Sequence, residues 1–222
     1  MDITTILFDL DGTLVDSAQE TALILNQMRS ERGYPPLNIS FFREKISHGA
    51  PALIECALDF CEERTADLIN EFRLKYKNIT TPESSLYPMV KNTLNELKKR
   101  NLKLGICTNK PENLCNKVLK DTGIIPYFDS VISQTPSMKL KPNPEPVNAA
   151  LTQLETTAKN TILVGDSTVD QRTCQATNIP FIFFKSGYND GIVSNQIYAS
   201  ITHISELLDF NIFSVNTLKT NT

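Results

Sequence analysis

The sequence predicts an α/β protein: a doubly wound parallel sheet with an all-helical cap inserted after the first strand. Two observations predict this fold. From about residue 86 onward, short apolar strands alternate with helices of about 10 residues, which is typical of right-handed crossovers in a parallel sheet covered on both faces. From about residue 16 to residue 80, the apolar residues instead recur at helical spacing.

The N-terminal part begins with a buried strand at residues 3 to 8 and continues in helices. Ser17 and Glu20 have the spacing of a capping box, which predicts that a helix starts there, and Gly33 with the prolines that follow ends it. Two more helices are predicted from apolar residues three and four positions apart: Leu53, Cys56, Ala57 and Phe60 in one, and Leu68, Phe72, Tyr76 and Ile79 in the other.

After a polar linker at residues 80 to 85, strands and helices alternate. Strands are predicted at LKLGICT (102–108), DSVIS (129–133), TILVG (161–165) and PFIFF (180–184). Helices are predicted at about residues 89 to 100, 111 to 121 and 169 to 177, with one more after Pro144. The predicted domains are a core of residues 1–15 and 86–210, a helical cap with its linker at 16–85, and a C-terminal tail at 211–222.

Composition and charge argue against several classes of function. The net charge of −3, from 22 basic and 25 acidic residues, gives no electrostatic footprint of a nucleic-acid binder. No apolar run approaches the roughly 18 residues of a membrane span, and the N-terminus does not resemble a signal peptide. The five cysteines, without any CxxC spacing, indicate reduced thiols. We therefore expect a cytoplasmic protein that binds neither nucleic acid nor membrane.

Two carboxylates, Asp9 and Asp11, follow the first strand within the segment FDLDGT. Side chains two residues apart in an extended chain point the same way, so both acids are expected to face one spot. Two negative charges about 4 Å apart repel by roughly 4 kcal/mol at an effective dielectric constant near 20. A cation, a shared proton or solvent must offset this repulsion.

Polar residues also follow the other predicted strands. Thr108 lies in CTNK, Lys141 in KLKPNPEP, and Asp166 and Asp170 in GDSTVD. Working groups of an open parallel sheet gather at the carboxyl ends of its strands, so we expect these residues to meet Asp9 there. Several carboxylates, a hydroxyl with nearby backbone donors and one lysine suit a phosphate bound beside a hard cation such as Mg²⁺.

Each of these signals has an ordinary structural explanation when it is taken alone. Asp166 and Asp170 could complement the dipole of a helix N-terminus, Lys141 could be a surface lysine, and Thr108 could be a turn or N-cap residue. A calcium-binding loop would need a third acid and a closing glutamate, which are missing after FDLDGT. The occurrence of all these residues at successive strand ends favours a functional site.

Four segments together resemble the four motifs of the haloacid dehalogenase-like hydrolases: FDLDGTLVDS, ICTNKP, LKPNPEP and VGDSTVD. The resemblance covers residue 3 to about residue 210, and four motifs in order at strand ends rarely occur by chance. Within this family the chain resembles the phosphoglycolate phosphatase-like group, which has a small helical cap after the first motif and a segment like GYND (187–190). The resemblance implies a Rossmann-like core and a Mg²⁺-dependent phosphatase, a monomer or homodimer, that acts on a small phosphorylated metabolite.

The roles of the acidic residues and the lysine follow from this resemblance. It implies that Asp9 is the nucleophile and forms an aspartyl-phosphate, and that Asp11 protonates the leaving oxygen and then activates water. Mg²⁺ would be held by the side chain of Asp9, the main-chain carbonyl of Asp11 and the side chain of Asp166. Lys141 would supply positive charge to the transition state, and Asp170 would orient Lys141 or a metal-bound water.

The resemblance also implies groups that bind the phosphate. Gly12 would let the backbone turn closely past it, and the N–H groups of Leu10 and Asp11 would point to it. Thr108, by its hydroxyl, and Asn109, by its backbone N–H, would bind the transferring oxygens.

The cap is expected to select the substrate. Arg43, His48 and Gly49 lie where phosphoglycolate phosphatases carry a related loop, and they are the candidates for contacts with the leaving group. The Ser-His-Gly sequence that contains His48 could instead simply cap the next helix. MRSERGYPP and REKISHGA also resemble the cap of bacterial N-acetylmuramic acid 6-phosphate phosphatases.

The best candidate substrate is therefore 2-phosphoglycolate, with N-acetylmuramic acid 6-phosphate or another sugar phosphate as the alternative. A phosphomutase uses the same core but returns the phosphoryl group to its substrate. A dehalogenase lacks the second acid of the first motif, so Asp11 argues against it. A non-catalytic phosphate-binding module would have lost the nucleophile or the lysine, and both Asp9 and Lys141 are present.

The sequence departs from the family pattern after Asp170. Relatives often have alanines and then a glycine there, whereas this chain has Thr173, Cys174, Thr177 and Asn178. Asparagine is the next-best residue after glycine for the left-handed turn at a helix end, so the helix is expected to end at Asn178.

Overall fold

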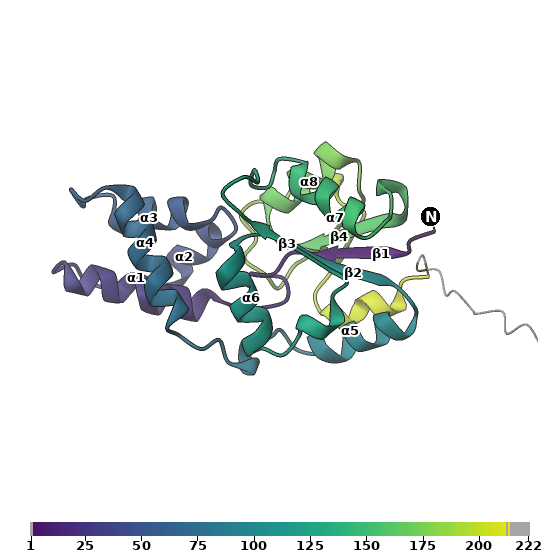
Figure 1. Cartoon of the computed structure of the whole chain (residues 1–222), viewed down its shortest axis with the longest axis horizontal. Coiled ribbons are helices and arrows are strands. Elements are labelled where there is room, and N and C mark those ends of the chain that lie inside the picture. The colour runs from purple at the N-terminus through teal and green to yellow at the C-terminus, as the bar shows by residue number, and fades with distance from the viewer. Residues whose placement is uncertain (1, 212, 214–222) are drawn as a thin grey trace, which may run out of the picture.

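The computed structural model describes residues 2–211 and 213, and a six-stranded parallel sheet forms its centre (Figure 1). The strand order is β3-β2-β1-β4-β5-β6, and each neighbouring pair is parallel. The strands are β1 Thr5–Phe8, β2 Lys103–Pro111, β3 Ser130–Gln134, β4 Thr161–Gly165, β5 Phe181–Phe184 and β6 Ala199–Ile201. The predicted doubly wound parallel sheet is therefore confirmed.

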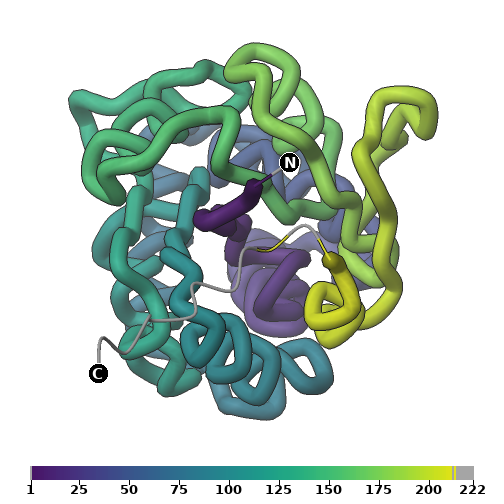
Figure 2. Tube along the Cα trace, turned by 90° about the vertical axis from the view of Figure 1, so that its right-hand side faces the viewer, coloured from purple at the N-terminus to yellow at the C-terminus, as the bar shows by residue number. Residues whose placement is uncertain are grey.

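The order of the strands reverses between β1 and β4. The chain adds β2 and β3 on one side of β1, and then β4, β5 and β6 on the other side. Figure 2 shows the N-terminal segment in the middle of the molecule, with later parts of the chain around it. In open α/β sheets, ligands bind outside the carboxyl ends of the strands at such a reversal. The segments that follow β1 and β4 are therefore the expected place for a site.

Helices cover both faces of the sheet, with α7 and α8 on one side of it and α5 and α6 on the other (Figure 1). Side chains of β1 alternate between the two layers: Ile6 and Phe8 pack in one buried cluster and Leu7 in the other. The helices are α5 Val90–Lys99, α6 Glu112–Asp121, α7 Glu145–Gln153 and α8 Thr168–Thr177. The near-continuous apolar character of the strands follows from this burial on both faces.

Four further helices form the cap to one side of the sheet, after β1, as predicted (Figure 1). They are α1 Ala18–Glu31, α2 Ile39–Ile46, α3 Ala50–Leu58 and α4 Thr65–Lys77. The chain enters and leaves this bundle side by side, because Val15 pairs with Leu86 in an antiparallel bridge and the Asp16 N–H donates to the Ser85 carbonyl over 2.8 Å. Short 3₁₀ helices lie at Glu83–Ser85, Ile125–Tyr127, Ala158–Asn160, Ser194–Gln196 and Ile204–Asp209.

The predicted capping box at the start of α1 is wrong. The Ser17 side chain makes no capping hydrogen bond; its hydroxyl donates to Asp11 Oδ1 over 2.6 Å. Glu20 accepts instead from the Ser85 hydroxyl over 2.9 Å. The local spacing did not show that Ser17 is buried beside a carboxylate, whose charge-assisted hydrogen bond fixes the direction of the hydroxyl. A capping box does form at α8, between Ser167 and Asp170.

Some elements differ from the prediction in extent. α2 was not predicted as a separate helix, and α3 ends at Leu58, before Phe60. β6 was also missed, because three residues carry too little alternation to indicate a strand. In the predicted tail at 211–222, Phe213 pairs with Ile3 in an isolated bridge, and residues 212 and 214–222 lie outside the described residues.

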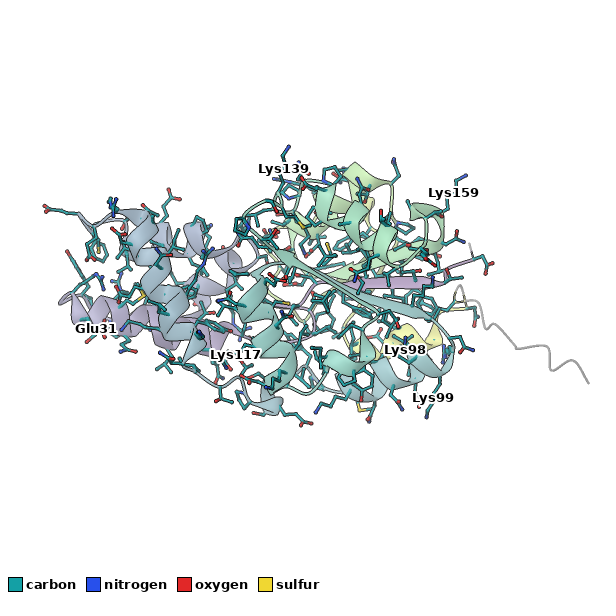
Figure 3. All side chains as sticks on the ribbon, viewed as in Figure 1. Glu31, Lys98, Lys99, Lys117, Lys139 and Lys159 are labelled. Atoms are coloured by element: carbon teal, nitrogen blue, oxygen red, sulfur yellow. The ribbon has the colours of Figure 1, made fainter. Side chains whose placement is uncertain are left out.

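Surface charge and thiols are as the composition indicates. Lys98 and Lys99 end α5, and the labelled lysines in Figure 3 lie on different sides of the molecule. All five cysteines are free thiols. No helix within the described residues is long and apolar enough to cross a membrane.

The end of α8 gives a test of the sequence-based interpretation of Asn178. Asn178 adopts φ 55°, in the left-handed region, as predicted. We expect Asn178→Ala to lower the free energy of unfolding by about 1 kcal/mol. The alanine side chain is strained in the left-handed conformation and, unlike asparagine, cannot form a local hydrogen bond that offsets the strain. Asn178→Gly is expected to be as stable as the natural chain or more stable. Urea denaturation measures both changes, and equal stability of the alanine and glycine variants would contradict this account of the helix end.

Candidate active site

Asp9 follows β1 directly and is buried at the carboxyl edge of the sheet. Its backbone N–H donates to the Val164 carbonyl of β4 over 3.0 Å, which fixes it at the reversal of strand order. Lys141 Nζ lies 3.1 Å from Asp9 Oδ1, a charge contact that lacks the angle of a hydrogen bond. Burial raises the pKa of Asp9 to about 7 although Lys141 lowers it. Asp9 is therefore a buried carboxyl group with an incompletely satisfied oxygen.

Three buried carboxylates form a cluster at this edge. Asp9, Asp166 and Asp170 each bring an oxygen within 4.8 Å of the others. Burial raises the pKa of Asp166 well above its usual range, and the neighbouring carboxylates add to this effect. Hydrogen bonds from the Tyr188 N–H and the Thr13 hydroxyl, both 2.8 Å long, oppose the shift. Within the described residues only Lys141 forms ion pairs with the cluster, so an excess of negative charge remains.

Lys141 reaches this cluster from the loop after β3. Its Nζ donates to Asp170 Oδ1 over 2.6 Å. Burial alone would lower the pKa of Lys141, but Asp170 and Asp9 raise it overall, so the ammonium stays charged. Asn109 holds the Lys141 backbone, because Asn109 Oδ1 accepts from the Lys141 N–H over 2.7 Å and Asn109 Nδ2 donates to the Lys141 carbonyl over 3.0 Å. The Asn109 side chain thus positions Lys141.

The Asp11 side chain has a cation of its own. Asp11 Oδ1 accepts from the Ser17 hydroxyl, and Lys110 Nζ lies 3.0 and 3.1 Å from the two carboxylate oxygens. Lys110 also donates to the Tyr76 hydroxyl over 3.3 Å. Burial would lower the pKa of Lys110, but the Asp11 carboxylate outweighs it and raises the pKa. Asp9 and Asp11 are therefore each in contact with a different lysine.

Two glycines leave the space that the Asp166 side chain occupies. Gly12 has φ +86°, and a Cβ there would lie 2.2 Å from Asp166 Oδ2 and 2.7 Å from the Tyr188 ring. A Cβ at Gly187 would lie 2.3 Å from the Cβ of Asp166. The structure thus shows a packing reason for Gly12 in addition to the predicted approach to a phosphate. Leu10, between the two acids, is buried, and its backbone hydrogen bond lowers the pKa of Asp9.

A cavity lies between the cap and the sheet, above Asp9. Thr108 lies in it, with its Oγ1 accepting from the Lys110 N–H over 3.3 Å. The core lines it with Asp9, Asp11, Thr108, Asn109, Lys110, Pro111 and Leu114, and the cap lines it with Thr21, Ile46, Ser47, Gly49, Ala50, Leu53, Phe72, Arg73 and Tyr76. A molecule in this cavity would be enclosed by both parts of the chain.

The three cap residues predicted from the sequence lie in different places. Gly49 lines the cavity, at the N-terminus of α3. Arg43 and His48 are not among the lining residues. Arg43 donates to Asp16 Oδ2 over 2.9 Å, and His48 Nε2 lies 2.8 Å from Asp190 Oδ2 in the loop after β5. The first pair joins the cap helix α2 to the segment that leads from β1 into the cap, and the second joins the cap to the core.

Several site residues were not identified from the sequence. Lys110 stands inside the segment ICTNKP, and Tyr188 inside GYND, so the motifs contained a signal for both. Ser47 and Arg73 line the cavity from the cap. Ser47 stands in REKISHGA, next to the predicted His48, so that segment contained a signal for it. Arg73 belongs to no recognised motif, and its position in the cavity wall depends on how the cap packs over the sheet.

Comparisons with known proteins agree with this geometry. The family model described as "Haloacid dehalogenase-like hydrolase" matches residues 6–184. A phosphoglycolate phosphatase of Cereibacter sphaeroides is 31% identical over 92% of this chain and 95% of its own length. One of Photorhabdus laumondii is 35% identical over 93% of this chain and 91% of its own. A crystal structure of a predicted phosphoglycolate phosphatase from Haemophilus somnus superposes with a TM-score of 0.84 at 25% identity, covering 94% of this chain and 98% of that one.

The close packing of Gly12 against Asp166 can be tested with a matched pair of variants. Gly33 has φ +76°, and a Cβ added there would have no atom within 4 Å, so Gly33→Ala reports backbone strain alone. Gly12→Ala adds a collision with Asp166, and we expect it to lower the free energy of unfolding by about 1–3 kcal/mol more than Gly33→Ala. Chemical denaturation measures the difference. Equal losses in the two variants would show that the packing at Asp166 is not tight.

Proposed function

The chain belongs to the haloacid dehalogenase-like hydrolases, and on that premise we propose that it hydrolyses 2-phosphoglycolate in a Mg²⁺-dependent reaction through a phosphorylated Asp9. It is an enzyme of the phosphatase type, since relatives over most of its length are named phosphoglycolate phosphatase. One observation carries the proposal: a buried carboxyl group with an unsatisfied oxygen lines a cavity between the cap and the core, beside a charged lysine.

The proposed reaction has two steps at Asp9. In the first, an Asp9 oxygen bonds to phosphorus, the bond from phosphorus to the leaving oxygen breaks, and Asp11 gives its proton to that oxygen. In the second, Asp11 takes a proton from water, the water oxygen attacks phosphorus, and phosphate leaves Asp9. Ser17 and Lys110 hold the Asp11 carboxyl group in the cavity wall for both proton transfers.

Other core residues would bind the phosphoryl oxygens. The Thr108 hydroxyl and the backbone N–H groups of Leu10 and Asn109 are the proposed donors, with Gly12 allowing the close approach. Lys141, fixed by Asp170, would stabilise the negative charge that develops in the transition state. On the cap side, Gly49 would contact the leaving group, while Arg43 and His48 would act by holding the cap in place.

A divalent cation fits the carboxylate cluster. Three buried carboxylates within 4.8 Å, with one lysine among them, leave a negative charge that a hard cation would offset with the oxygen ligands it prefers. We propose Mg²⁺, held by the side chains of Asp9 and Asp166 and by the main-chain carbonyl of Asp11. When bound, it would neutralise the repulsion between the phosphate and the attacking carboxylate. Asp170 would remain free to orient Lys141.

A substrate panel tests the proposal. Phosphate release would be measured with 2-phosphoglycolate, N-acetylmuramic acid 6-phosphate and several hexose phosphates, each with Mg²⁺ and with EDTA. We expect metal-dependent turnover with a strong preference for 2-phosphoglycolate. If an amino-sugar phosphate or a hexose phosphate is preferred, that compound takes the place of 2-phosphoglycolate as the proposed substrate. If a hexose phosphate gives an isomeric phosphorylated product, the enzyme is a phosphomutase.

Replacement of the proposed nucleophile gives a direct prediction. Asp9→Asn removes the attacking oxygen anion but keeps the size of the side chain, so turnover should fall to the detection limit while the melting temperature of the metal-free protein stays the same or rises, because a buried charge is removed. Phosphate release and thermal unfolding are measured on the same sample. Appreciable turnover by the folded variant would show that another group attacks phosphorus.

The raised pKa values of the cluster predict how metal and pH act on stability. Folding raises the pKa of Asp9 to about 7 and also that of Asp166, so the folded metal-free protein binds more protons than the unfolded chain between about pH 4 and 7. The contribution of these groups to stability is therefore lost as pH rises through that window. Mg²⁺ binds the deprotonated carboxylates.

We therefore expect Mg²⁺ to raise the melting temperature of the EDTA-treated protein more at about pH 8 than at about pH 5. Thermal unfolding with and without Mg²⁺ at both pH values measures this difference. Asp166→Asn serves as the control, because it should abolish most of the metal effect. An equal Mg²⁺ effect at the two pH values would contradict the assignment of the cluster as the metal site.

A further inference from the structure

Two polar groups of the cap are buried in the cavity wall without a partner. Ser47 Oγ and Arg73 Nε each have no hydrogen-bond partner within the described residues, and both residues line the cavity above Asp9. A buried polar group that stays unpaired costs about 1–3 kcal/mol, and more when it is charged. A ligand in the cavity would lie next to both residues and would supply acceptors for them.

The cationic side chains near the cavity differ in how many hydrogen bonds and ion pairs they form with the protein. Lys110 is paired with Asp11 and Tyr76, and Lys141 with Asp9 and Asp170. Arg73 has, among the described residues, a single contact, from Nη2 to Gln134 Oε1 at 3.5 Å, which is the outer limit of a hydrogen bond. A guanidinium carries five N–H donors, so most donors of Arg73 have no protein partner among the described residues, and the Nε donor is buried as well.

The cap holds these two groups in defined positions. Arg73 lies on α4 between Phe72 and Tyr76, whose burial fixes that helix against the cap and Lys110. Ser47 follows the last residue of α2, and Asn109 Nδ2 donates to its carbonyl over 3.4 Å. Donors from two cap segments therefore line the same cavity as the core carboxylate Asp9.

We propose that Ser47 and Arg73 form a binding site for a carboxylate on the leaving group of the substrate. A guanidinium matches a carboxylate with two parallel N–H donors, and a serine hydroxyl can bond one of the same oxygens. The surrounding cap residues Ile46, Leu53 and Phe72 are apolar, which strengthens such a pair. The inference rests on the proposed function, because it takes the phosphate to lie at Asp9.

The site specifies a substrate class. The substrate would carry a phosphate monoester at one end and a carboxylate at the other, short enough for both to fit between Asp9 and α4. 2-Phosphoglycolate has this chemistry, and hexose phosphates without a carboxylate do not.

The test compares two non-hydrolysable analogues, 3-phosphonopropionate, which has the carboxylate, and propylphosphonate, which has a methyl group in its place. Binding to the full chain with Mg²⁺ would be measured by calorimetry. We expect the natural chain to prefer 3-phosphonopropionate, and Arg73→Gln to weaken its binding on the order of tenfold to a hundredfold while propylphosphonate is unaffected. Ser47→Ala should give a smaller loss of the same kind.

Arg64→Gln is the matched control. Arg64 stands at the N-terminus of the same helix, α4, with a side chain that is 83% exposed, so its replacement should leave both affinities unchanged. Melting temperatures would show that each variant folds. Equal binding of the two analogues by the natural chain, or an equal loss for both in Arg73→Gln, would overturn the carboxylate site.

Failure of the carboxylate site and failure of the proposed function give different results. An Arg73-dependent preference for 3-phosphonopropionate without turnover of 2-phosphoglycolate would support the carboxylate site and reject the substrate. Turnover of 2-phosphoglycolate that is unchanged in Arg73→Gln, together with equal binding of the analogues, would reject the carboxylate site and keep the phosphatase activity.

Discussion

Four carboxylates crowd the carboxyl edge of the sheet, and the rest of the site depends on how their charge is offset. Lys141 forms ion pairs with Asp9 and Asp170, and Lys110 forms one with Asp11. Asp166 has only neutral hydrogen-bond donors among the described residues, the Tyr188 N–H and the Thr13 hydroxyl. The remaining negative charge is what a divalent cation would offset in the proposed metal site.

The cap and the core contribute different kinds of residue to the cavity. The core lines the cavity with the charged residues Asp9, Asp11 and Lys110, and the cap contributes a mainly apolar wall. In that wall, Ser47 Oγ and Arg73 Nε are buried polar atoms without a hydrogen-bond partner among the described residues. The cap is attached by the paired linkers and by the contacts of Arg43 with Asp16 and of His48 with Asp190. Because the cap and the core both line the cavity, a leaving group bound there would contact residues of both parts in the proposed reaction.

The sequence predicted the order of the elements, the parallel sheet and the inserted cap, because each rests on local periodicity or on motifs at strand ends. The family resemblance implied that Asp170 orients Lys141 or a metal-bound water; the structure has Lys141 Nζ donating to Asp170 Oδ1, and the role of Asp170 stays a prediction. Contacts between distant segments could not be predicted from local patterns. Lys110 contacts Asp11, which is 99 positions away in the sequence, and Tyr188 contacts Asp16, which is 172 positions away. The error at Ser17 has the same cause, since a buried carboxylate six residues upstream takes the hydroxyl that local spacing assigned to a helix cap.

The central claim is that the phosphoryl group passes through Asp9, and chemical trapping tests it most directly. Borohydride reduces an acyl phosphate to a primary alcohol, so a phosphorylated aspartate becomes homoserine and can be located by peptide mass spectrometry. After rapid quenching of the enzyme with 2-phosphoglycolate and Mg²⁺, the account predicts homoserine at position 9, and none when EDTA is present. Phosphate release with an unmodified Asp9, or with a modification at another carboxylate, would contradict the account.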